Sequence, residues 1–293
     1  MEITTYEQVQ LDKSAVALGK FQGLHRGHML LLDKIISLKD EGLTSVVFTI
    51  NVPSAQSIYL PEERFAILEK CGVDVAVECD FSESFASMSP ETFVRDILVD
   101  RLHAAYVVVG EDFKFGYNRK GTVDRLVQFG IKYGFRVIAF EKLRVDDEVV
   151  SSSFLRTLIE RGDLEHVSRY MGRDYSLTGI VAQGKQLGRT IGFPTVNLYP
   201  PAEKMLPPAG VYETQLYIDG EGYQGITNIG DNPTVDNDGR LRVETHIIDY
   251  SGDLYGKKLT VFFKRFIRRE IKFHSVDELK KQIATDKKNV LHQ

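Results

Sequence analysis

The feature that most limits how this chain can fold is a change in hydrophobic pattern about half-way along its 293 residues. Between residues 14 and 140, short apolar or β-branched runs alternate with stretches whose apolar residues recur at helical spacing, as Leu31, Ile35 and Leu38 do. The apolar runs cover residues 15–18, 45–50, 73–78, 105–109 and 136–140. Strands that alternate with helices in this way predict parallel βαβ units, so we expect an α/β doubly wound sheet in the N-terminal half.

The C-terminal half has a different pattern. Two short helical patterns end near Gly172, and from Tyr175 onward strand signals separated by Gly, Pro or Asn turns dominate. This pattern predicts an all-β antiparallel barrel followed by a C-terminal helix over residues 275–287. A chain of this length exceeds the usual size of a single hydrophobic core, so we expect two domains, residues 1–172 and 173–293.

Composition and charge limit the classes of partner. A formal net charge of −4 and a pI near 6.0 argue against the diffuse attraction on which nucleic-acid binding depends, so we expect no nucleic-acid partner. We also expect no membrane association, because no apolar run approaches the length of a bilayer span and the N-terminus lacks the features of a secretory signal. These features predict a cytoplasmic protein in which Cys71 and Cys79 are buried thiols.

One stretch of the C-terminal half combines three glycines, two cations and a Phe-Pro-Thr-Val-Asn run. It reads Gly184-Lys-Gln-Leu-Gly-Arg-Thr-Ile-Gly-Phe-Pro-Thr-Val-Asn197. Glycine lets backbone N–H groups approach phosphate oxygens, and Lys and Arg side chains can balance the phosphate charge. Thr195 and Asn197 point to the same side of an extended segment, where a hydroxyl and an amide carbonyl can share one Mg²⁺. Taken alone, a glycine-rich loop before a strand is more often only a turn. The predicted nucleotide-phosphate and metal site consists of Gly184, Lys185, Gly188, Arg189, Gly192, Thr195 and Asn197.

This stretch resembles the signature of riboflavin kinases, G-x-x-x-G-R-x-x-G-F-P-T-x-N, and further matches follow in order. They are Gly210-Val-Tyr212, Asn228-Ile-Gly-Asp-Asn-Pro-Thr234, Glu244-Thr-His246, Leu254-Tyr-Gly256 and Ile267-Arg-Arg-Glu270. The resemblance covers the chain from Tyr175 to its C-terminus and implies phosphorylation of riboflavin to FMN with ATP and Mg²⁺. In that family a carboxylate on a barrel strand is the base for the ribityl hydroxyl, and Glu244 is the matching position.

Glu244 is expected to share one face of its strand with Arg242 and His246, because side chains alternate along a strand. The alternative to a catalytic role is an exposed carboxylate that simply pairs with Arg242. We interpret His246 as a structural neighbour of the base. The resemblance also implies residues on the flavin side of the site, namely Asn228, Gly230 and Arg268. For Arg268 the alternative is that it stabilises the polar network.

In the N-terminal half, a strand that ends at Gly19 runs into Gly19-Lys-Phe-Gln-Gly-Leu-His-Arg-Gly-His28 and then into a helix. Two imidazoles at a helix N-terminus suit the triphosphate of a nucleotide, because histidine donors and the N–H groups of a helix N-terminus both stabilise negative charge. The alternative is that His25 and His28 merely cap the helix and pack in its loop.

The motif resembles the nucleotidyltransferase superfamily and, specifically, the FMN adenylyltransferase domain that precedes riboflavin kinase in bacterial bifunctional FAD synthetases. Gly110-Glu-Asp-Phe-Lys-Phe-Gly116 and Ser151-Ser-Ser-Phe-Leu-Arg156 are further matches, so the resemblance covers almost the whole chain. The implied nucleotide site consists of Gly19, Phe21, Gly23, His25, His28, Gly110, Asp112, Ser152, Ser153 and Arg156.

Three positions depart from this family's pattern. Gln22 stands where the family has Asp, and Phe154 stands where an extra basic residue often follows the S-S-T element. The segment after the second strand, Phe48-Thr-Ile-Asn-Val-Pro-Ser-Ala55, lacks the usual Pro-His-Pro, which removes an expected contact to the FMN phosphate. All three lie in the expected active site, so we predict a riboflavin kinase whose adenylyltransferase-like domain is impaired or repurposed.

Two alternatives stay open. The first is a fully bifunctional riboflavin kinase/FAD synthetase that also converts FMN and ATP to FAD and diphosphate. The second is a flavin- or nucleotide-sensing regulatory protein that kept the binding folds and lost turnover. The set of Lys185, Thr195, Asn197 and Glu244 argues against a sensor, which has little need for a base and metal ligands together. The expected small-molecule partners are riboflavin, ATP and FMN.

Overall fold

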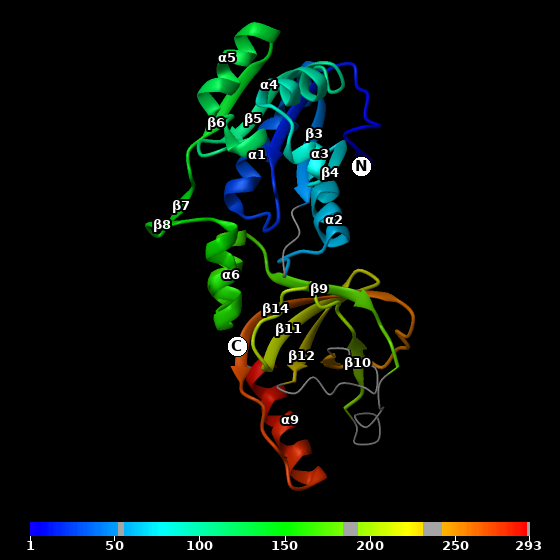
Figure 1. The fold of residues 1–293 in the computed structure, drawn as a ribbon. Coiled ribbons are helices and arrows are strands. Elements are labelled where there is room, and N and C mark those ends of the chain that lie inside the picture. The colour runs from blue at the N-terminus through cyan, green and yellow to red at the C-terminus, as the bar shows by residue number, and fades with distance from the viewer. Residues whose placement is uncertain (52–55, 184–192, 231–241, 292–293) are drawn as a thin grey trace. The chain divides into compact units, whose positions relative to one another are not determined.

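The computed structural model describes residues 1–51, 56–183, 193–230 and 242–291. Figure 1 traces the chain from blue at the N-terminus to red at the C-terminus. The chain forms two compact units, Met1–Ser152 and Ser153–Gln293.

The first unit is built on a six-stranded sheet in which all strands pair in parallel, in the order β1-β4-β3-β2-β5-β6. Its strands are β1 (Glu2–Thr5), β2 (Ser14–Gly19), β3 (Thr44–Asn51), β4 (Val75–Asp80), β5 (Ala104–Gly110) and β6 (Arg136–Phe140). The α-helices are α1 (Arg26–Ser37), α2 (Pro61–Cys71), α3 (Glu83–Ala86), α4 (Pro90–Thr92) and α5 (Val123–Tyr133). Shorter elements are the 3-10 helices η1 (Leu38–Glu41) and η3 (Tyr117–Arg119), the π-helix η2 (Phe93–Val99), and the hairpin of β7 (Arg144–Val145) and β8 (Glu148–Val149). The predicted α/β doubly wound fold is confirmed.

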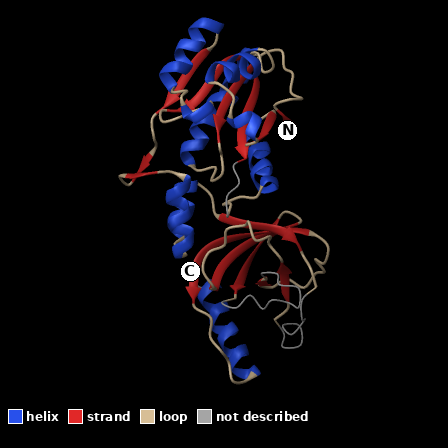
Figure 2. Ribbon diagram, in the orientation of Figure 1, coloured by secondary structure: helices blue, strands red, loops and turns tan. Residues whose placement is uncertain are grey.

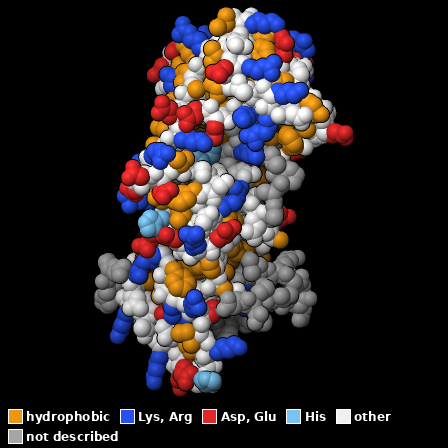
Figure 3. All heavy atoms as spheres, turned by 60° about the vertical axis from the view of Figure 1, so that its left-hand side comes forward, with side chains coloured by type: hydrophobic (Ala, Val, Ile, Leu, Met, Phe, Trp, Pro, Cys, Tyr) orange, Lys and Arg blue, Asp and Glu red, His pale blue; other side chains and the backbone are white. Residues whose placement is uncertain are grey.

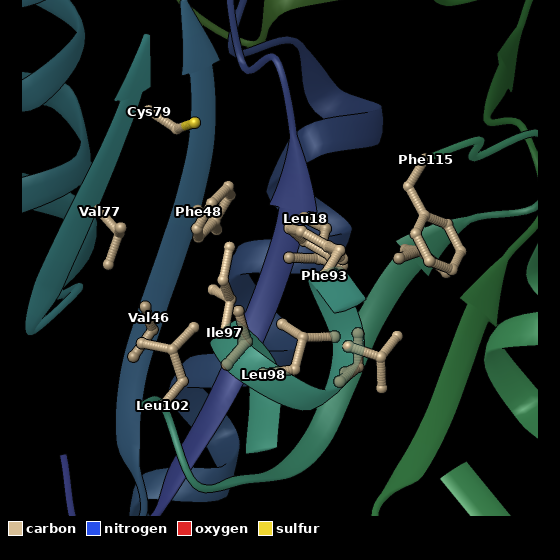
Figure 4. Packing of buried hydrophobic residues seen from close by; sticks show 14 of the residues in the cluster. Leu18, Val46, Phe48, Val77, Cys79, Phe93, Ile97, Leu98, Leu102 and Phe115 are labelled. Atoms are coloured by element: carbon tan, nitrogen blue, oxygen red, sulfur yellow. The ribbon is translucent and has the colours of Figure 1, made fainter. Parts of the chain in front are cut away.

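The alternation of side chains along the strands divides the core of this unit between the two faces of the sheet. Val16 and Leu18 lie in a buried apolar cluster with Phe93 and Ile97 of η2, and Figure 4 shows η2 lying across this face. The intervening residues of β2 point to the other face, which α1 covers with Leu31, Leu32 and Ile35. Helices on both faces are what a buried parallel sheet requires.

The second unit is built on a six-stranded antiparallel sheet in the order β10-β13-β12-β11-β14-β9. Its strands are β9 (Tyr175–Ile180), β10 (Thr195–Leu198), β11 (Gly210–Ile218), β12 (Glu221–Ile229), β13 (Val243–Ile247) and β14 (Lys258–Arg268). The sheet curls (Figure 2), and a bridge between Ala182 and Asn197 joins its two edges. The predicted barrel is therefore confirmed, as is the C-terminal helix, α9 (Val276–Leu291).

The helix α9 is held to the barrel by a buried ion pair. Asp286 of α9 is 1% exposed and accepts hydrogen bonds from Nε and Nη2 of Arg268, at the end of β14. Val290 of the same helix packs against Val211 and Ile226 of the sheet. Charge pairing and apolar burial therefore both fix the helix over this side of the barrel.

Two short helices, α6 (Ser152–Arg161) and α7 (Leu164–Met171), lie at the junction of the units. We expected them to close the first domain, whereas the division after Ser152 places them with the barrel. The physical reason is that α7 packs against β9 and β14. The boundary between residues 172 and 173 stays a prediction about where the chain separates into independently folding parts.

The described part of the chain contains no helix that is long and apolar enough to cross a membrane. On the face shown in Figure 3, basic and acidic side chains are interspersed rather than gathered by sign. Cys79 is buried and Cys71 is partly buried, and both are thiols. Burial raises the pKa of the Cys79 thiol to about 12.

Candidate active sites

The first candidate site lies where the order of the parallel sheet reverses. The chain runs from β2 to β3 and β4 on one side, and then returns to place β5 on the other side of β2. Open α/β sheets bind ligands at such a switch point, beyond the carboxyl ends of the strands. Gly19 ends β2 and Gly110 ends β5, so the two motifs found in the sequence start at this point.

The two histidines of the first motif lie at the N-terminus of α1. His25 is the N-cap residue, and its Nδ1 accepts a hydrogen bond of 3.3 Å from the backbone N–H of His28. The two rings are stacked, with centroids 3.7 Å apart, and the ring of Phe21 lies 5.0 Å from that of His28. Because Nδ1 of His25 accepts, a neutral His25 carries its proton on Nε2. A side chain at position 27 would meet that Nδ1 at 3.1 Å, which favours Gly27.

The loop before α1 holds two apolar residues in an unfavourable backbone conformation. Phe21 and Leu24 have φ of 46° and 40°, and both side chains are fully buried. Such conformations in non-glycine residues cost on the order of 1–3 kcal/mol and cluster at functional sites. Gly23 lies between these two residues, as does the partly buried Gln22. The loop is therefore held in a specific shape at the end of β2.

The second motif continues from β5. Asp112 is exposed and forms an ion pair of 3.0 Å with Nζ of Lys142, and Glu111 accepts a hydrogen bond from the backbone N–H of the same lysine. The last glycine of the motif, Gly116, has a φ of 69°, and a Cβ there would lie 2.6 Å from the backbone nitrogen of Pro90. This glycine is therefore required by the fold, whereas Asp112 is positioned beside the switch point.

The three departures from the family pattern have different surroundings. The Phe154 ring packs edge-on against Tyr170 of α7, with centroids 5.0 Å apart, so it has a packing role within the second unit. At the end of β3, Asn51 donates to Glu78 and accepts from the buried Arg64 of α2. Burial lowers the pKa of Arg64, and Glu78 opposes that shift. The rest of the segment that lacks Pro-His-Pro, residues 52–55, lies outside the described residues.

The third motif of the N-terminal site crosses the division between the units. Ser152 belongs to the first unit, whereas Ser153 and Arg156 belong to the second. All three lie at the start of α6. Their place beside the histidines stays a prediction.

The second candidate site is a row of polar side chains across three strands of the barrel. Asn197 on β10 is the register partner of Glu244 on β13, and Glu244 is also the partner of Asn228 on β12. Directly opposed residues of antiparallel strands project from the same face, with Cβ atoms about 4.5–5.5 Å apart. The barrel therefore brings together three residues that lie far apart in the sequence.

Asn197 is the most buried member of this row. Its side chain is 3% exposed, and its Oδ1 has no hydrogen-bond partner among the residues that the structure describes. A buried acceptor without a donor is costly, and a cation that binds from the solvent side would satisfy it. Thr195, two residues earlier on β10, opposes His246 on the same face. A carbonyl oxygen and a hydroxyl oxygen are ligands that a hard cation such as Mg²⁺ prefers, so Thr195 and Asn197 could hold one.

A hollow of about 310 Å³ adjoins these two residues. Thr195 and Asn197 line one side of it, and residues 250–255 line another. This loop contains the Leu254-Tyr-Gly256 match, and it turns at Asp253, whose Oδ1 accepts from the backbone N–H of Tyr255. The hollow is therefore a candidate nucleotide pocket next to the candidate metal ligands. Sequence reasoning had given no role to its residues 250–253.

Glu244 is half-buried and forms an ion pair of 3.3 Å between its Oε1 and Nη1 of Arg242. The pair with Arg242 that we considered as the alternative to catalysis is therefore present. Glu244 nevertheless stays next to Asn197, its register partner. Nδ1 of His246 donates to the carbonyl oxygen of Pro194 at 2.9 Å, and burial lowers the pKa of this imidazole while that hydrogen bond opposes the shift. A neutral His246 that anchors the start of β10 fits the structural role we expected for it.

The residues expected on the flavin side differ in what they contact. Asn228 donates from Nδ2 to Oε1 of Glu270 at 2.8 Å, and Gly230 directly follows β12. Arg268 is engaged with Asp286, so in this structure its guanidinium serves the attachment of α9. Its flavin contact stays a prediction. The predicted phosphate-binding residues Gly184, Lys185, Gly188, Arg189 and Gly192 lie outside the described residues.

Fold and sites together define a class of protein in which a nucleotidyltransferase-like domain is followed by a flavokinase-type barrel. The FAD synthetase family matches residues 7–154 of the chain, and the riboflavin kinase family matches residues 171–293. The chain is 36% identical to the bifunctional riboflavin kinase/FMN adenylyltransferase of Pseudomonas fluorescens, over 92% of this chain and 89% of that protein. It is 33% identical to the Bacillus subtilis protein of the same name, over 95% and 92%. The chain therefore belongs to the bifunctional riboflavin kinase/FMN adenylyltransferase family.

A solved structure supports the same architecture over the whole chain. A protein of Streptococcus pneumoniae, named as a macrolide-efflux protein, matches with a TM-score of 0.86 and 29% identity. The match covers 98% of this chain and 97% of that one. The order of the two domains is therefore shared with a protein of known structure.

Proposed function

We propose that this chain catalyses two consecutive reactions, the phosphorylation of riboflavin by ATP to FMN and ADP, and the adenylylation of FMN by a second ATP to FAD and diphosphate. The observation that carries the proposal is that each unit holds one group of candidate catalytic residues. These are the Asn197–Glu244 pair in the barrel and the His25–His28 pair at the switch point. Relatives that match over most of their own length, and whose names contain both activities, favour this reading over a kinase with an impaired first domain. The predicted impairment is not confirmed.

In the kinase reaction, Glu244 would accept the proton of the terminal ribityl hydroxyl as that oxygen attacks the γ-phosphorus of ATP and ADP leaves. Phosphoryl transfer depends mainly on positioning and on charge neutralisation. Thr195 and Asn197 would hold Mg²⁺, which when bound neutralises phosphate charge. The pairing of Glu244 with Arg242 holds the carboxylate beside these ligands before the substrate binds.

In the adenylyltransferase reaction, a phosphate oxygen of FMN would attack the α-phosphorus of ATP, and diphosphate would leave. The chain contributes donors at the place where negative charge builds up, namely the N–H groups at the start of α1 and the imidazole of His28, with Nε2–H of His25 beside it. The burial of Phe21 and Leu24 fixes the loop that carries these donors. Preorganised donors of this kind stabilise the transition state without reorganising during the reaction.

The departures from the family pattern are compatible with this proposal. Phe154 contributes to packing between α6 and α7, so a phenylalanine at this position stabilises the helix pair where the family often has a basic residue. At the end of β3, the Asn51 side chain is held by Arg64 and Glu78, so the strand end stays ordered without the histidine of the family pattern. Gln22 keeps a polar side chain next to Phe21 in the same loop.

Isotope-labelled ATP tests which phosphorus atom each reaction transfers. With riboflavin as substrate, label in the γ-phosphate should appear in FMN, and among the flavins label in the α-phosphate should appear only in FAD. Both transfers should stop when EDTA removes divalent cations and return with excess Mg²⁺. Incorporation of γ-label without any α-label would leave only the kinase reaction, and incorporation of neither would support a binding protein without turnover.

A further inference from the structure

A carboxylate that has no assigned role lies next to the kinase constellation. Glu270 follows the end of β14 by two residues, and its Oε1 accepts a hydrogen bond of 2.8 Å from Nδ2 of Asn228. Asn228 is in turn the register partner of Glu244, on the opposite side of β13 from Asn197. Glu270 therefore extends the polar row across the barrel to a fourth member.

This hydrogen bond determines how the amide of Asn228 is oriented. A side-chain amide can present either its NH₂ group or its carbonyl oxygen to a given neighbour, and a carboxylate accepts only from the NH₂ group. Hydrogen bonds to an ionised acceptor are also stronger than those between neutral groups. Glu270 thus holds Nδ2 on its own side and leaves Oδ1 of Asn228 directed away from Glu270.

The orientation matters because of what the base must do. The attacking hydroxyl donates its proton to Glu244 while its oxygen attacks phosphorus, so that oxygen must stay nucleophilic. A hydrogen bond from an N–H of Asn228 to that oxygen would withdraw electron density from it and stabilise the ground state, and both effects slow the reaction. A carbonyl oxygen at the same place instead accepts from a hydroxyl on the neighbouring carbon of the chain.

We propose that Glu270 is a positioning residue for the kinase reaction, which orients the Asn228 amide so that its carbonyl accepts from a hydroxyl adjacent to the one that is phosphorylated. The inference rests on the proposed kinase function and adds the recognition of a chain with neighbouring hydroxyl groups. It also gives Asn228 and Glu270, which lie 42 residues apart, one shared task.

A double-mutant cycle on the full chain tests the inference. Glu270→Ala and Asn228→Ala should each raise KM for riboflavin about tenfold, the effect of losing one hydrogen bond to the substrate, and leave KM for ATP unchanged. The double variant should be no worse than either single variant, because both changes remove the same interaction. Glu270→Gln should stay within about threefold of the unchanged protein, since its amide oxygen also accepts from Nδ2. Glu221→Ala, an exposed glutamate on the same hairpin as Asn228, is the matched control.

Additive effects of the two alanine substitutions would overturn the inference, as would an equal rise in both KM values or a Glu270→Gln variant as poor as Glu270→Ala. Thermal unfolding of each variant separates loss of structure from loss of positioning. Should the unchanged protein form no FMN, the proposed kinase function fails. Titration of riboflavin fluorescence with the same variants would then still decide the role of Glu270. Weaker flavin binding in Glu270→Ala would support the inference, and unchanged flavin binding would overturn it.

Discussion

The two candidate sites are constructed in different ways. In the parallel sheet, the chemical groups lie on loops and at a helix N-terminus beyond the strand ends, and the strands themselves are filled with apolar residues. In the barrel, the groups lie on the strands, where Asn197, Glu244 and Asn228 alternate with core residues such as Thr245 and Thr227. A loop-built site can exchange residues such as Gln22 while the fold persists. A strand-built site is tied to the register of the sheet, so its substitutions affect chemistry and packing together.

The largest effect is expected at the strand-built site. Glu244→Gln removes the base but keeps the size of the side chain, so the rate of FMN formation from riboflavin should fall about 10²- to 10⁴-fold. FAD formation from supplied FMN should be unchanged, because the histidine site is not altered. Product chromatography measures both rates, with Glu221→Gln as the control. An unchanged rate of FMN formation would exclude Glu244 as the base.

The next largest effect concerns the attachment of α9 rather than chemistry. Arg268→Ala leaves the buried carboxylate of Asp286 without its cation, so the free energy of unfolding should fall by about 3–5 kcal/mol. Urea denaturation followed by circular dichroism measures the loss. If Arg268 instead acts mainly on flavin, stability would stay nearly the same and riboflavin affinity would fall.

A substitution in the loop-built site should lower FAD formation and spare FMN formation, which is the reverse of the effect expected for Glu244→Gln. His28→Ala removes an imidazole donor at the start of α1, so FAD formation from FMN should fall about 10²- to 10³-fold while FMN formation from riboflavin stays the same. His274→Ala, an exposed histidine before α9, is the control. Equal loss of both activities would contradict two separate sites, and no loss of FAD formation would assign the histidine pair to packing alone.

The smallest effect tests the packing behind the strand-built site. Thr214, Thr227 and Thr245 form a buried row in which the hydroxyl of Thr227 lies 2.9 Å and 2.8 Å from those of its two neighbours. Thr227→Val keeps the shape but leaves both neighbours short of a partner, so unfolding free energy should fall by about 1–3 kcal/mol. Thr157→Val, a surface change in α6, should cost far less in the same denaturation assay.

The sequence predicts the two folds well because each rests on local patterns. Alternating apolar runs and helical spacing define the parallel sheet, and dense turn signals define the barrel. The helices α6 and α7 have an amphipathic pattern that indicates burial without indicating the partner, so the packing of α7 against β9 and β14 appears only in the structure.

The candidate site residues were found through motifs, whereas their partners were not. Asn228 and Glu270, and likewise Arg268 and Asp286, meet through sheet register and helix docking over separations of 42 and 18 residues. No periodicity connects such pairs. Phe154 is a similar case, since its contact with Tyr170 depends on the angle between two helices.

The most direct test of the central claim supplies the purified chain with FMN, ATP and Mg²⁺, without riboflavin, and follows the products by chromatography over time. The account predicts FAD and diphosphate in equal amounts, formed at a rate that Glu244→Gln does not change and His28→Ala strongly lowers. An absence of FAD, from a preparation that converts riboflavin to FMN, would contradict the account and leave a kinase with an inactive first domain.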